Sequence, residues 1–191
     1  MKLITLDIKD LYTNLPTTGI IQATKFWLHN TPLNIDENKQ IITILETIIE
    51  QNYFQYNDNF YKPHKGVAMG SPLSGTLAEL YLQRIENRYI KQWLDSNEIY
   101  YYKRYVDDII ILINTQEEQL LANINSIDKH LYFNITKEDN NNKINFLDLT
   151  LTRNKYNIQV NIHRKETSTD TVIHYLSNHP IEQNGSIQVL H

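Results

Sequence analysis

The sequence has no cysteine, and it has only five glycines and five prolines among its 191 residues. Without cysteine, the protein has neither a disulfide framework nor a zinc site built on thiolates. So few glycines and prolines leave no long flexible linker, and we expect a single continuous domain. No stretch reaches the roughly 18 consecutive apolar residues of a membrane helix, and no signal-peptide pattern opens the chain. We therefore expect a protein of the nucleus or cytoplasm that has no membrane partner.

The residues that are present are typical of a folded domain. Hydrophobic residues make up 41% of the chain and charged residues 21%, a balance that allows a hydrophobic core. The net charge of −4 does not favour nucleic-acid binding, but such binding needs only a local basic patch. Basic side chains are interleaved with tyrosines, which would suit contacts with a nucleic-acid backbone and bases. The basic clusters lie at residues 62–65, 103–104, 153–155 and 163–165.

Hydrophobic periodicity predicts strands and helices in a mixed order. Strands are expected at the start of the chain, in two aromatic runs around Asn57–Asn59, and on both sides of a turn at Val106–Asp108. Further strands are expected in LYFNITK and in a hairpin that begins with INFLDLTLTR. Leu147, Leu149 and Leu151 would share one face of that last strand. Helices are expected over 17–30, around 41–49, after 71–72 and from 115 onward. This order predicts an α+β fold, a split βαβ sheet with helices on one face.

Two adjacent aspartates, Asp107 and Asp108, interrupt the apolar run YYKRYVDDIIILI. Aspartate is depleted in strands, a buried unpaired carboxylate is costly, and two neighbouring carboxylates repel each other. The pair must therefore lie in an exposed hairpin turn or bind cations. This stretch alone leaves both alternatives open.

A third carboxylate favours the cation alternative. Asp7 stands at the end of the apolar strand LITLDI, and a sheet could bring that strand end beside the Asp107–Asp108 turn. Converging carboxylates suit Mg²⁺, which binds one or two of them together with substrate phosphates. Two such ions can hold the attacking and leaving oxygens of a phosphoryl transfer.

The loop KGVAMGSPLSG lies between the two acidic sites in the sequence. Gly66 and Gly70 allow close approach of the backbone to a ligand. Ser71 and Pro72 offer an N-cap followed by proline at the first helical position, and a helix N-terminus favours phosphate. A Gly-Ser-Pro helix start is common by itself, and it is the placement of this loop between the two carboxylate sites that adds weight to the phosphate-binding interpretation.

Four segments in this order carry a family resemblance: DIKDLYTNLP, AMGSPLSGTLAELYL, KRYVDDIIIL and NFLDLTLTR. They resemble the successive motifs of a reverse transcriptase palm, in the form found in Penelope-like retroelements. The stretch HRKETSTDTVIHYLSNHP is also similar to that family, although His163 and Glu166 replace an aromatic residue and a proline. The resemblance covers nearly the whole chain and implies a polymerase palm, whose antiparallel sheet is ferredoxin-like.

The resemblance implies roles for the acidic residues. Asp7 and Asp107 would be the main ligands of two Mg²⁺ ions, with Mn²⁺ as an alternative metal, and Asp108 would be the third acidic member of the site. One ion would lower the pKa of the primer 3′-OH and the other would neutralise the leaving pyrophosphate.

The resemblance also implies residues that bind the nucleotide. Tyr12 would be the aromatic gate that excludes a 2′-OH. Met69, Gly70, Ser71 and Pro72 would line the incoming nucleotide and the template, with Met69 standing where many reverse transcriptases have Gln. Lys137, after the strand YFNIT, would protonate pyrophosphate.

The same resemblance implies partners and missing parts. Residues 1–165 would form the palm, and 166–191 the start of a thumb or connector. Most of the fingers, the thumb and a GIY-YIG endonuclease would lie outside the sequence, as expected for a piece of a larger or decayed element. We expect such a piece to be a poor polymerase alone and to expose apolar surface where fingers and thumb would pack.

The expected function is that of an RNA-directed DNA polymerase that uses dNTPs and a primed RNA or DNA template. One alternative is an RNA-dependent RNA polymerase, in which Gly-Asp-Asp and a second aspartate would be expected in place of Val106 and Tyr12. The other is a non-catalytic remnant, or a domesticated module that only binds nucleic acid.

Overall fold

The structure is a computed structural model that describes residues 1–114, 117–155 and 157–165. The segment 166–191, expected to begin a thumb or connector, lies outside the described residues. No helix in the described part of the chain is long and apolar enough to cross a membrane.

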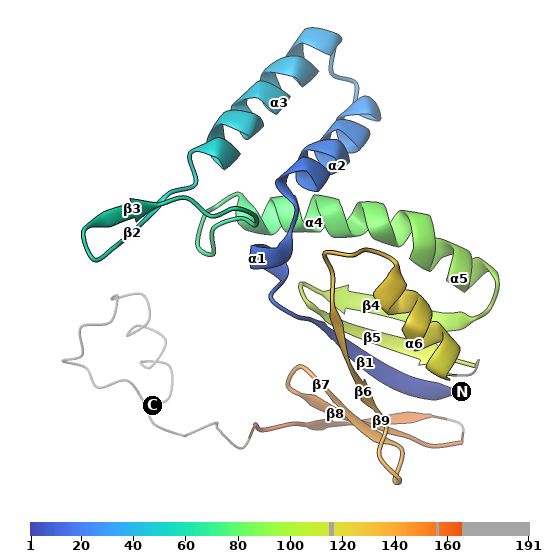
Figure 1. Ribbon diagram of the computed structural model, residues 1–191. Helices are drawn as coiled ribbons and strands as arrows, with labels where there is room; N and C mark the ends of the chain where they lie inside the picture. The colour runs from blue at the N-terminus through green and yellow to red at the C-terminus, as the bar shows by residue number, and fades with distance from the viewer. Residues whose placement is uncertain (115–116, 156, 166–191) are drawn as a thin grey trace, which may run out of the picture.

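A four-stranded antiparallel sheet forms the centre of the molecule, as Figure 1 shows. Its strands, in spatial order, are β4 (Ile99–Tyr105), β5 (Asp108–Ile113), β1 (Lys2–Ile8) and β6 (Phe133–Lys137). The first strand of the chain thus lies inside the sheet, paired with β5 on one side and β6 on the other. This position explains its apolar sequence, because both of its edges and both of its faces are covered.

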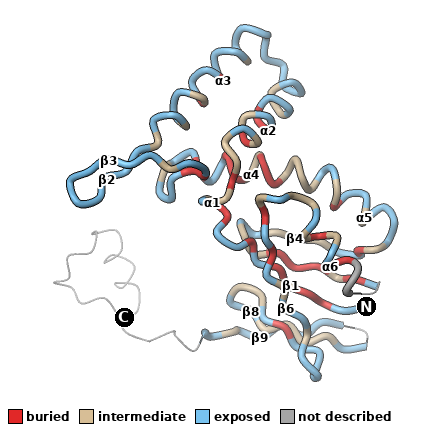
Figure 2. The backbone as a smooth tube through the Cα atoms, viewed as in Figure 1, coloured by how far each residue is buried: buried red, intermediate tan, exposed pale blue. Residues whose placement is uncertain are grey.

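The two faces of β1 have different neighbours. Ile4, Leu6 and Ile8 alternate onto the face that packs against the helices, and each is at most 3% exposed. Leu3 lies on the other face, in a smaller apolar cluster with residues of β5 and β7. Figure 2 shows that the buried residues concentrate in this sheet and in the helices beside it.

The helices that pack on the first face come from separate parts of the chain. They are α4 (Ser74–Ile85) and α6 (Glu117–Ser126), while α2 (Thr17–His29) packs on α4. The helix α4 continues through a π-helical turn, η1 (Glu86–Ile90), into α5 (Lys91–Asp95). Below the other face lies a three-stranded sheet of β7 (Lys143–Phe146), β8 (Leu149–Arg153) and β9 (Ile158–Ile162). The expected α+β arrangement, with helices on one face of the main sheet, is present.

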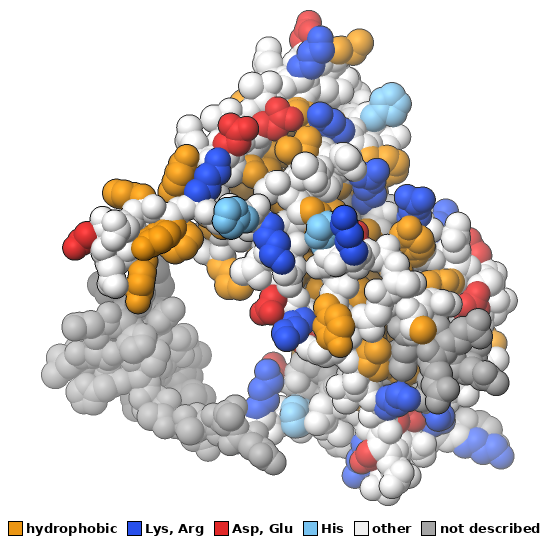
Figure 3. All heavy atoms as spheres, in the orientation of Figure 1, with side chains coloured by type: hydrophobic (Ala, Val, Ile, Leu, Met, Phe, Trp, Pro, Cys, Tyr) orange, Lys and Arg blue, Asp and Glu red, His pale blue; other side chains and the backbone are white. Residues whose placement is uncertain are grey.

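A projecting arm completes the fold. The helices α2 and α3 (Ile35–Glu50) pack side by side, and a hairpin of β2 (Phe54–Tyr56) and β3 (Asn59–Tyr61) extends from the end of α3 (Figure 1). Hydrophobic side chains gather over this hairpin in Figure 3. Its exposed aromatic residues are Tyr53, Phe54, Tyr56, Phe60 and Tyr61. The arm therefore carries exposed aromatic surface, and whether fingers or thumb would pack there stays a prediction.

Two local expectations were wrong. The helix α4 begins at Ser74 rather than at Ser71–Pro72, and the residue before it, Leu73, makes no side-chain cap bond. A tight turn delays the helix, because the Ala68 carbonyl accepts hydrogen bonds from the Ser71 amide and from the Ser74 hydroxyl. Leu147 does not share a strand face with the leucines after it, because it lies in the β7–β8 turn with φ of 53°.

Candidate active site

The strand pairing brings the predicted carboxylates together. Asp7, the penultimate residue of β1, lies directly opposite Asp108, the first residue of β5. Directly opposed residues of an antiparallel pair have Cβ atoms about 4.5–5.5 Å apart and point to the same face. Asp107 is the second residue of the two-residue turn between β4 and β5, directly before Asp108. Its carbonyl accepts a 3.0 Å hydrogen bond from the Ile8 amide. The sequence-based expectation that Asp7 would meet this turn is confirmed.

The electrostatics of the site agree with this convergence. Partial burial raises the pKa of the Asp108 carboxyl above its ordinary value, and the charges of Asp107 and then Asp7 raise it further. The positive charge of Lys165 acts in the opposite direction. Three carboxylates therefore repel one another at one edge of the sheet, as the sequence predicted, and a lysine near the end of the described chain lies within their field.

We expect Asp108→Asn to stabilise the protein at neutral pH and to lose this advantage in acid. The raised pKa means that the folded state takes up this proton more readily than the unfolded state does. The ionised carboxylate therefore destabilises the fold above its folded pKa. This penalty disappears as the pH falls through that value toward about 3.9, the ordinary pKa of aspartate.

Thermal unfolding of the wild type and of Asp108→Asn, measured without divalent metal from neutral pH to about pH 3, checks this. The two midpoints should converge as the pH falls. A difference that stays constant over the whole range would contradict the electrostatic account.

The turn itself is strained. Val106 adopts a left-handed backbone with φ of 54°, which a β-branched residue rarely does. Its neighbour Asp107 completes a two-residue turn between antiparallel strands, where the right-handed twist favours positive φ. The geometry thus presents two consecutive carboxylates at the sheet edge at the expense of local strain.

An amide lies on the other side of Asp7. Asn134 of β6 pairs directly with Asp7, and its side-chain nitrogen donates a 3.2 Å hydrogen bond to the Asp7 carboxylate. This contact orients the carboxylate from the side opposite Asp108. The sequence analysis did not identify Asn134, because 127 residues separate the two partners and no local pattern links them.

Tyr12 lies in a one-turn helix, α1 (Leu11–Asn14), immediately after β1. Its ring is partly buried against the main core. It also lines an open cleft of about 420 Å³, together with Val106 of the acidic turn and with Gly75 and Thr76 of α4. Tyr12 and the Asp107 turn are therefore on the same cleft.

The glycine loop is joined to this segment through the backbone. The Gly66 amide donates to the Leu15 carbonyl at 3.0 Å, and the Val67 amide donates to the Tyr12 carbonyl at 2.8 Å. Gly66 has φ of 85°, and a Cβ there would lie 2.7 Å from the Thr13 carbonyl oxygen. Only glycine fits this close approach. The loop thus holds the backbone of Tyr12 in a fixed position at the cleft.

We expect Gly66→Ala to destabilise the protein by about 2 kcal/mol or more, because left-handed strain and a backbone clash add together. Gly70→Ala should cost less, since Gly70 has φ of 91° but open space around a Cβ. Gly75→Ala is the control, because a Cβ there meets nothing within 4 Å and alanine favours the helix. Urea unfolding of the three variants should give this order, and equal midpoints for Gly66→Ala and Gly75→Ala would contradict it.

The remaining predicted residues lie outside this cleft. Met69 is 67% exposed, and the segment 69–72 precedes α4 without lining the cleft of Tyr12. Ser71 instead borders a smaller depression beside Ile48 and Ile49 of α3. Lys137 pairs with Ile4, three residues along β1 from Asp7, and is exposed. Lys137 therefore lies three residues along β6 from Asn134, which pairs with Asp7.

The three carboxylates fit a divalent cation whose remaining ligands would come from a substrate. Among the described residues, no group of three or more His, Cys, Asp or Glu side chains forms a ready metal cage. The three aspartates nevertheless supply only oxygen donors, and Mg²⁺ is usually held by one or two carboxylates, waters and substrate phosphates. Asp7, Asp107 and Asp108 are thus the residues that could hold such an ion.

Three further side chains beside the cleft were missed as site residues. Glu79 and Arg104 line it, and Arg104 makes a bidentate ion pair with Glu79 at 2.8 and 3.0 Å. Arg104 also pairs with Glu86 at the start of η1. The sequence analysis noted Lys103–Arg104 only as a basic cluster, since its acidic partners are 18 and 25 residues away.

Comparison with known proteins identifies the family. The family model described as "Reverse transcriptase (RNA-dependent DNA polymerase)" matches residues 2–176. No curated protein matches the chain in a sequence comparison.

Solved structures of telomerase share the fold. Apo telomerase from Candida tropicalis aligns with a TM-score of 0.65 and 17% identity, over 79% of this chain and 30% of that one. Telomerase from Candida albicans, in complex with a TWJ fragment of telomeric RNA, aligns with a TM-score of 0.61 and 17% identity, over 90% of this chain and 33% of that one. The chain thus spans about a third of the length of these telomerases. At this identity the likeness concerns the fold alone, and it confirms the expected α+β palm architecture.

The family match covers nearly the whole chain and includes the segments of Asp7, Tyr12 and Asp107–Asp108. In the structure Asp7 pairs with Asp108, and Tyr12 lines a cleft that Val106, the residue before Asp107, also lines. The chain therefore belongs to the reverse transcriptase (RNA-dependent DNA polymerase) family, a family of nucleotidyltransferases.

Proposed function

We propose that this chain is the catalytic palm of an RNA-directed DNA polymerase from a Penelope-like retroelement. The observation that carries the proposal is the direct pairing of Asp7 with Asp108, beside Asp107 in the turn. The Penelope-like assignment is supported by the motifs DIKDLYTNLP and AMGSPLSG. We also propose that fingers and thumb are supplied by segments outside these 191 residues.

The proposed reaction extends a primer that is paired with an RNA or DNA template. The primer 3′-oxygen attacks the α-phosphorus of a dNTP and loses its proton, the new phosphodiester bond forms, and pyrophosphate leaves. Asp7 and Asp107 would hold the divalent metal, with Asp108 as the third acidic group. Bound Mg²⁺ would supply positive charge to the attacking and leaving oxygens.

The other residues of the cleft would position the substrate. Tyr12 and Val106 line the cleft beside the acidic turn, where the sugar of an incoming nucleotide would lie. The Gly66 loop holds the backbone of Tyr12, so the position of the ring in the cleft is restricted. The charge of Lys165 reaches Asp108 and would also attract the phosphates of a primer or nucleotide. Positioning and electrostatics are the expected sources of rate in such a site.

The experiment is primer extension by the palm completed with fingers and thumb, on a primed RNA template with Mg²⁺. We expect extension with dNTPs that requires both the RNA template and the metal. Extension with rNTPs but not dNTPs would replace the proposal by an RNA polymerase. Binding of the primed template without any extension would replace it by a module that only binds nucleic acid.

A further inference from the structure

A buried arginine lies directly beside the acidic turn. Arg104 is the penultimate residue of β4, and its side chain is only 6% exposed. One of its terminal nitrogens donates to the Val106 carbonyl at 3.1 Å. The same guanidinium therefore contacts the turn that carries Asp107 and Asp108 and also the helix below it.

Two glutamates hold the guanidinium from the helix side. Glu79 of α4 accepts two hydrogen bonds from Arg104, at 2.8 and 3.0 Å. Glu86, the first residue of η1, accepts from the Arg104 ε-nitrogen at 2.5 Å and from a terminal nitrogen at 3.2 Å. All five N–H groups of an arginine lie in one planar fork, so these contacts fix the orientation of that plane.

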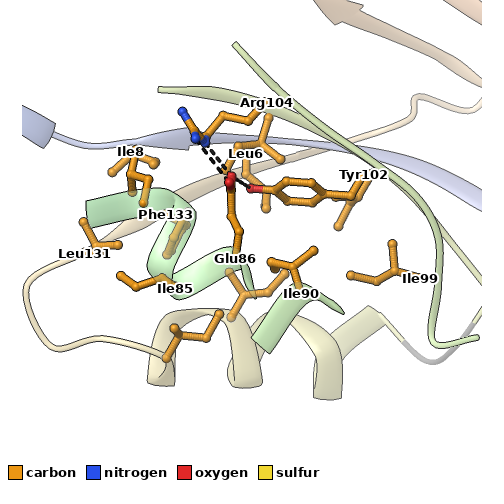
Figure 4. A pocket seen from close by; sticks show the side chains of 15 residues that line it. Leu6, Ile8, Ile85, Glu86, Ile90, Ile99, Tyr102, Arg104, Leu131 and Phe133 are labelled. Carbon is orange, nitrogen blue, oxygen red and sulfur yellow. Dashed lines mark hydrogen bonds and ion pairs between the residues drawn. The ribbon is translucent and has the colours of Figure 1, made fainter. Parts of the chain in front are cut away.

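Glu86 is itself fixed by its surroundings. Figure 4 shows its carboxylate beside Arg104 and Tyr102, whose hydroxyl donates to Glu86 at 2.7 Å. Apolar side chains that include Ile85, Ile90 and Ile99 surround the rest of this pocket. Charged hydrogen bonds in such surroundings are short and directional. Through Glu86, Arg104 is thus anchored to a mostly buried group that Tyr102 also holds.

The turn needs such an anchor. Val106 has the strained φ of 54°, and strained residues persist only where their surroundings over-determine them. On its other side, the turn is held by the bond from the Ile8 amide to the Asp107 carbonyl. Arg104 therefore holds the residue before the aspartates, and β1 holds the first aspartate.

We propose that Arg104 is a positioning residue that sets the two turn aspartates against Asp7, by tying the Val106 carbonyl to Glu79 and Glu86. The inference rests on the proposed function for the use of those aspartates, but the position of the turn can be measured without catalysis. The Ile8 amide reports it, because its hydrogen-bond acceptor is Asp107.

The test is amide hydrogen exchange and Mn²⁺ binding by electron paramagnetic resonance, both on the 191-residue chain. In Arg104→Gln, we expect the Ile8 amide to exchange about tenfold faster relative to the amides of residues 4–6, as loss of a charged hydrogen bond implies. The Kd for Mn²⁺ should rise by about the same factor. Arg104→Lys should behave like Arg104→Gln, because an ammonium cannot span three acceptors in one plane.

A matched control is available in a second, partly buried ion pair. Arg153 donates two 2.8 Å hydrogen bonds to Glu138, which also accepts from the Leu3 amide at the far end of β1. Arg153→Gln should lower stability without changing the relative exchange of Ile8 or the Kd for Mn²⁺.

An Ile8 exchange rate, relative to residues 4–6, that is unchanged in Arg104→Gln would overturn the proposal. Wild-type exchange of Ile8 and a wild-type Kd for Mn²⁺ in Arg104→Lys would also overturn it. If the wild-type chain binds no Mn²⁺, the proposed function fails at this site, while the exchange of Ile8 still decides the role of Arg104.

Discussion

Asp7→Asn and Asp107→Asn should each reduce primer extension by at least about a thousandfold, because each removes an anionic oxygen donor from the proposed metal-binding edge. Asparagine has nearly the same shape as aspartate, so the strand pairing of Asp7 with Asp108 should survive. The loss of one charge also reduces the mutual repulsion that raises the pKa of Asp108. We therefore expect inactive proteins whose metal-free stability equals or exceeds that of the wild type.

Three measurements check this expectation together. Primer extension is measured with fingers and thumb present, while thermal unfolding and Mn²⁺ binding are measured on the 191-residue chain. Asp95→Asn is the control, because Asp95 is exposed at the end of α5 and should leave all three values unchanged. Extension at the wild-type rate by either Asp7→Asn or Asp107→Asn would remove that residue from the catalytic site.

The parts of the fold that follow local rules could be predicted from the sequence. Asn57 and Asp58 adopt φ of 47° and 59°, as a two-residue hairpin turn between aromatic strands requires. The meeting of Asp7 with Asp108 could be predicted because each of them lies where an apolar strand ends or starts. Such signals depend on neighbouring residues only, and neighbouring residues are what a sequence displays.

The errors arose where a contact from elsewhere in the chain, or an unexpected turn, won over a local signal. Ser71 and Pro72 have the pattern of a helix start, but the Ala68 carbonyl binds Ser71 and Ser74 and holds the segment in a turn. Leu147 fits the alternation of the next strand, but its φ of 53° places it in the preceding turn.

The unpredicted part of the site consists of side-chain contacts over long separations. Arg104 meets Glu79 and Glu86 because β4 runs over α4 and η1, and Asn134 meets Asp7 because β6 is placed next to β1. No spacing in the sequence encodes these contacts, since they depend on how complete elements pack. Asn134 orients the Asp7 carboxylate, and we propose that Arg104 positions the turn, whereas the sequence indicated only the acidic groups and that Asp7 would meet the turn.

We expect the choice of sugar to depend on Tyr12. Its ring lies partly against the core and partly on the cleft that Val106 also lines, so it has little freedom to move aside. The bond from the Val67 amide to the Tyr12 carbonyl fixes the backbone beneath it. A nucleotide whose phosphates lie at Asp7 and Asp107 would place its sugar over this ring. A 2′-OH would then clash with the ring, whereas a deoxyribose would fit.

Tyr12→Ala should therefore lower the preference for dNTPs over rNTPs by roughly a hundredfold, with a smaller loss in the use of dNTPs, because steric exclusion penalises only the wrong substrate. Tyr12→Phe should retain most of the preference, since ring bulk rather than the hydroxyl excludes the ribose. The measurement is kcat/KM for a matched dNTP and rNTP in the polymerase completed with fingers and thumb. A ratio that is unchanged in Tyr12→Ala would place the sugar elsewhere in the cleft. A preference for dNTPs that falls equally in Tyr12→Ala and Tyr12→Phe would show that the hydroxyl makes a specific contact with the substrate.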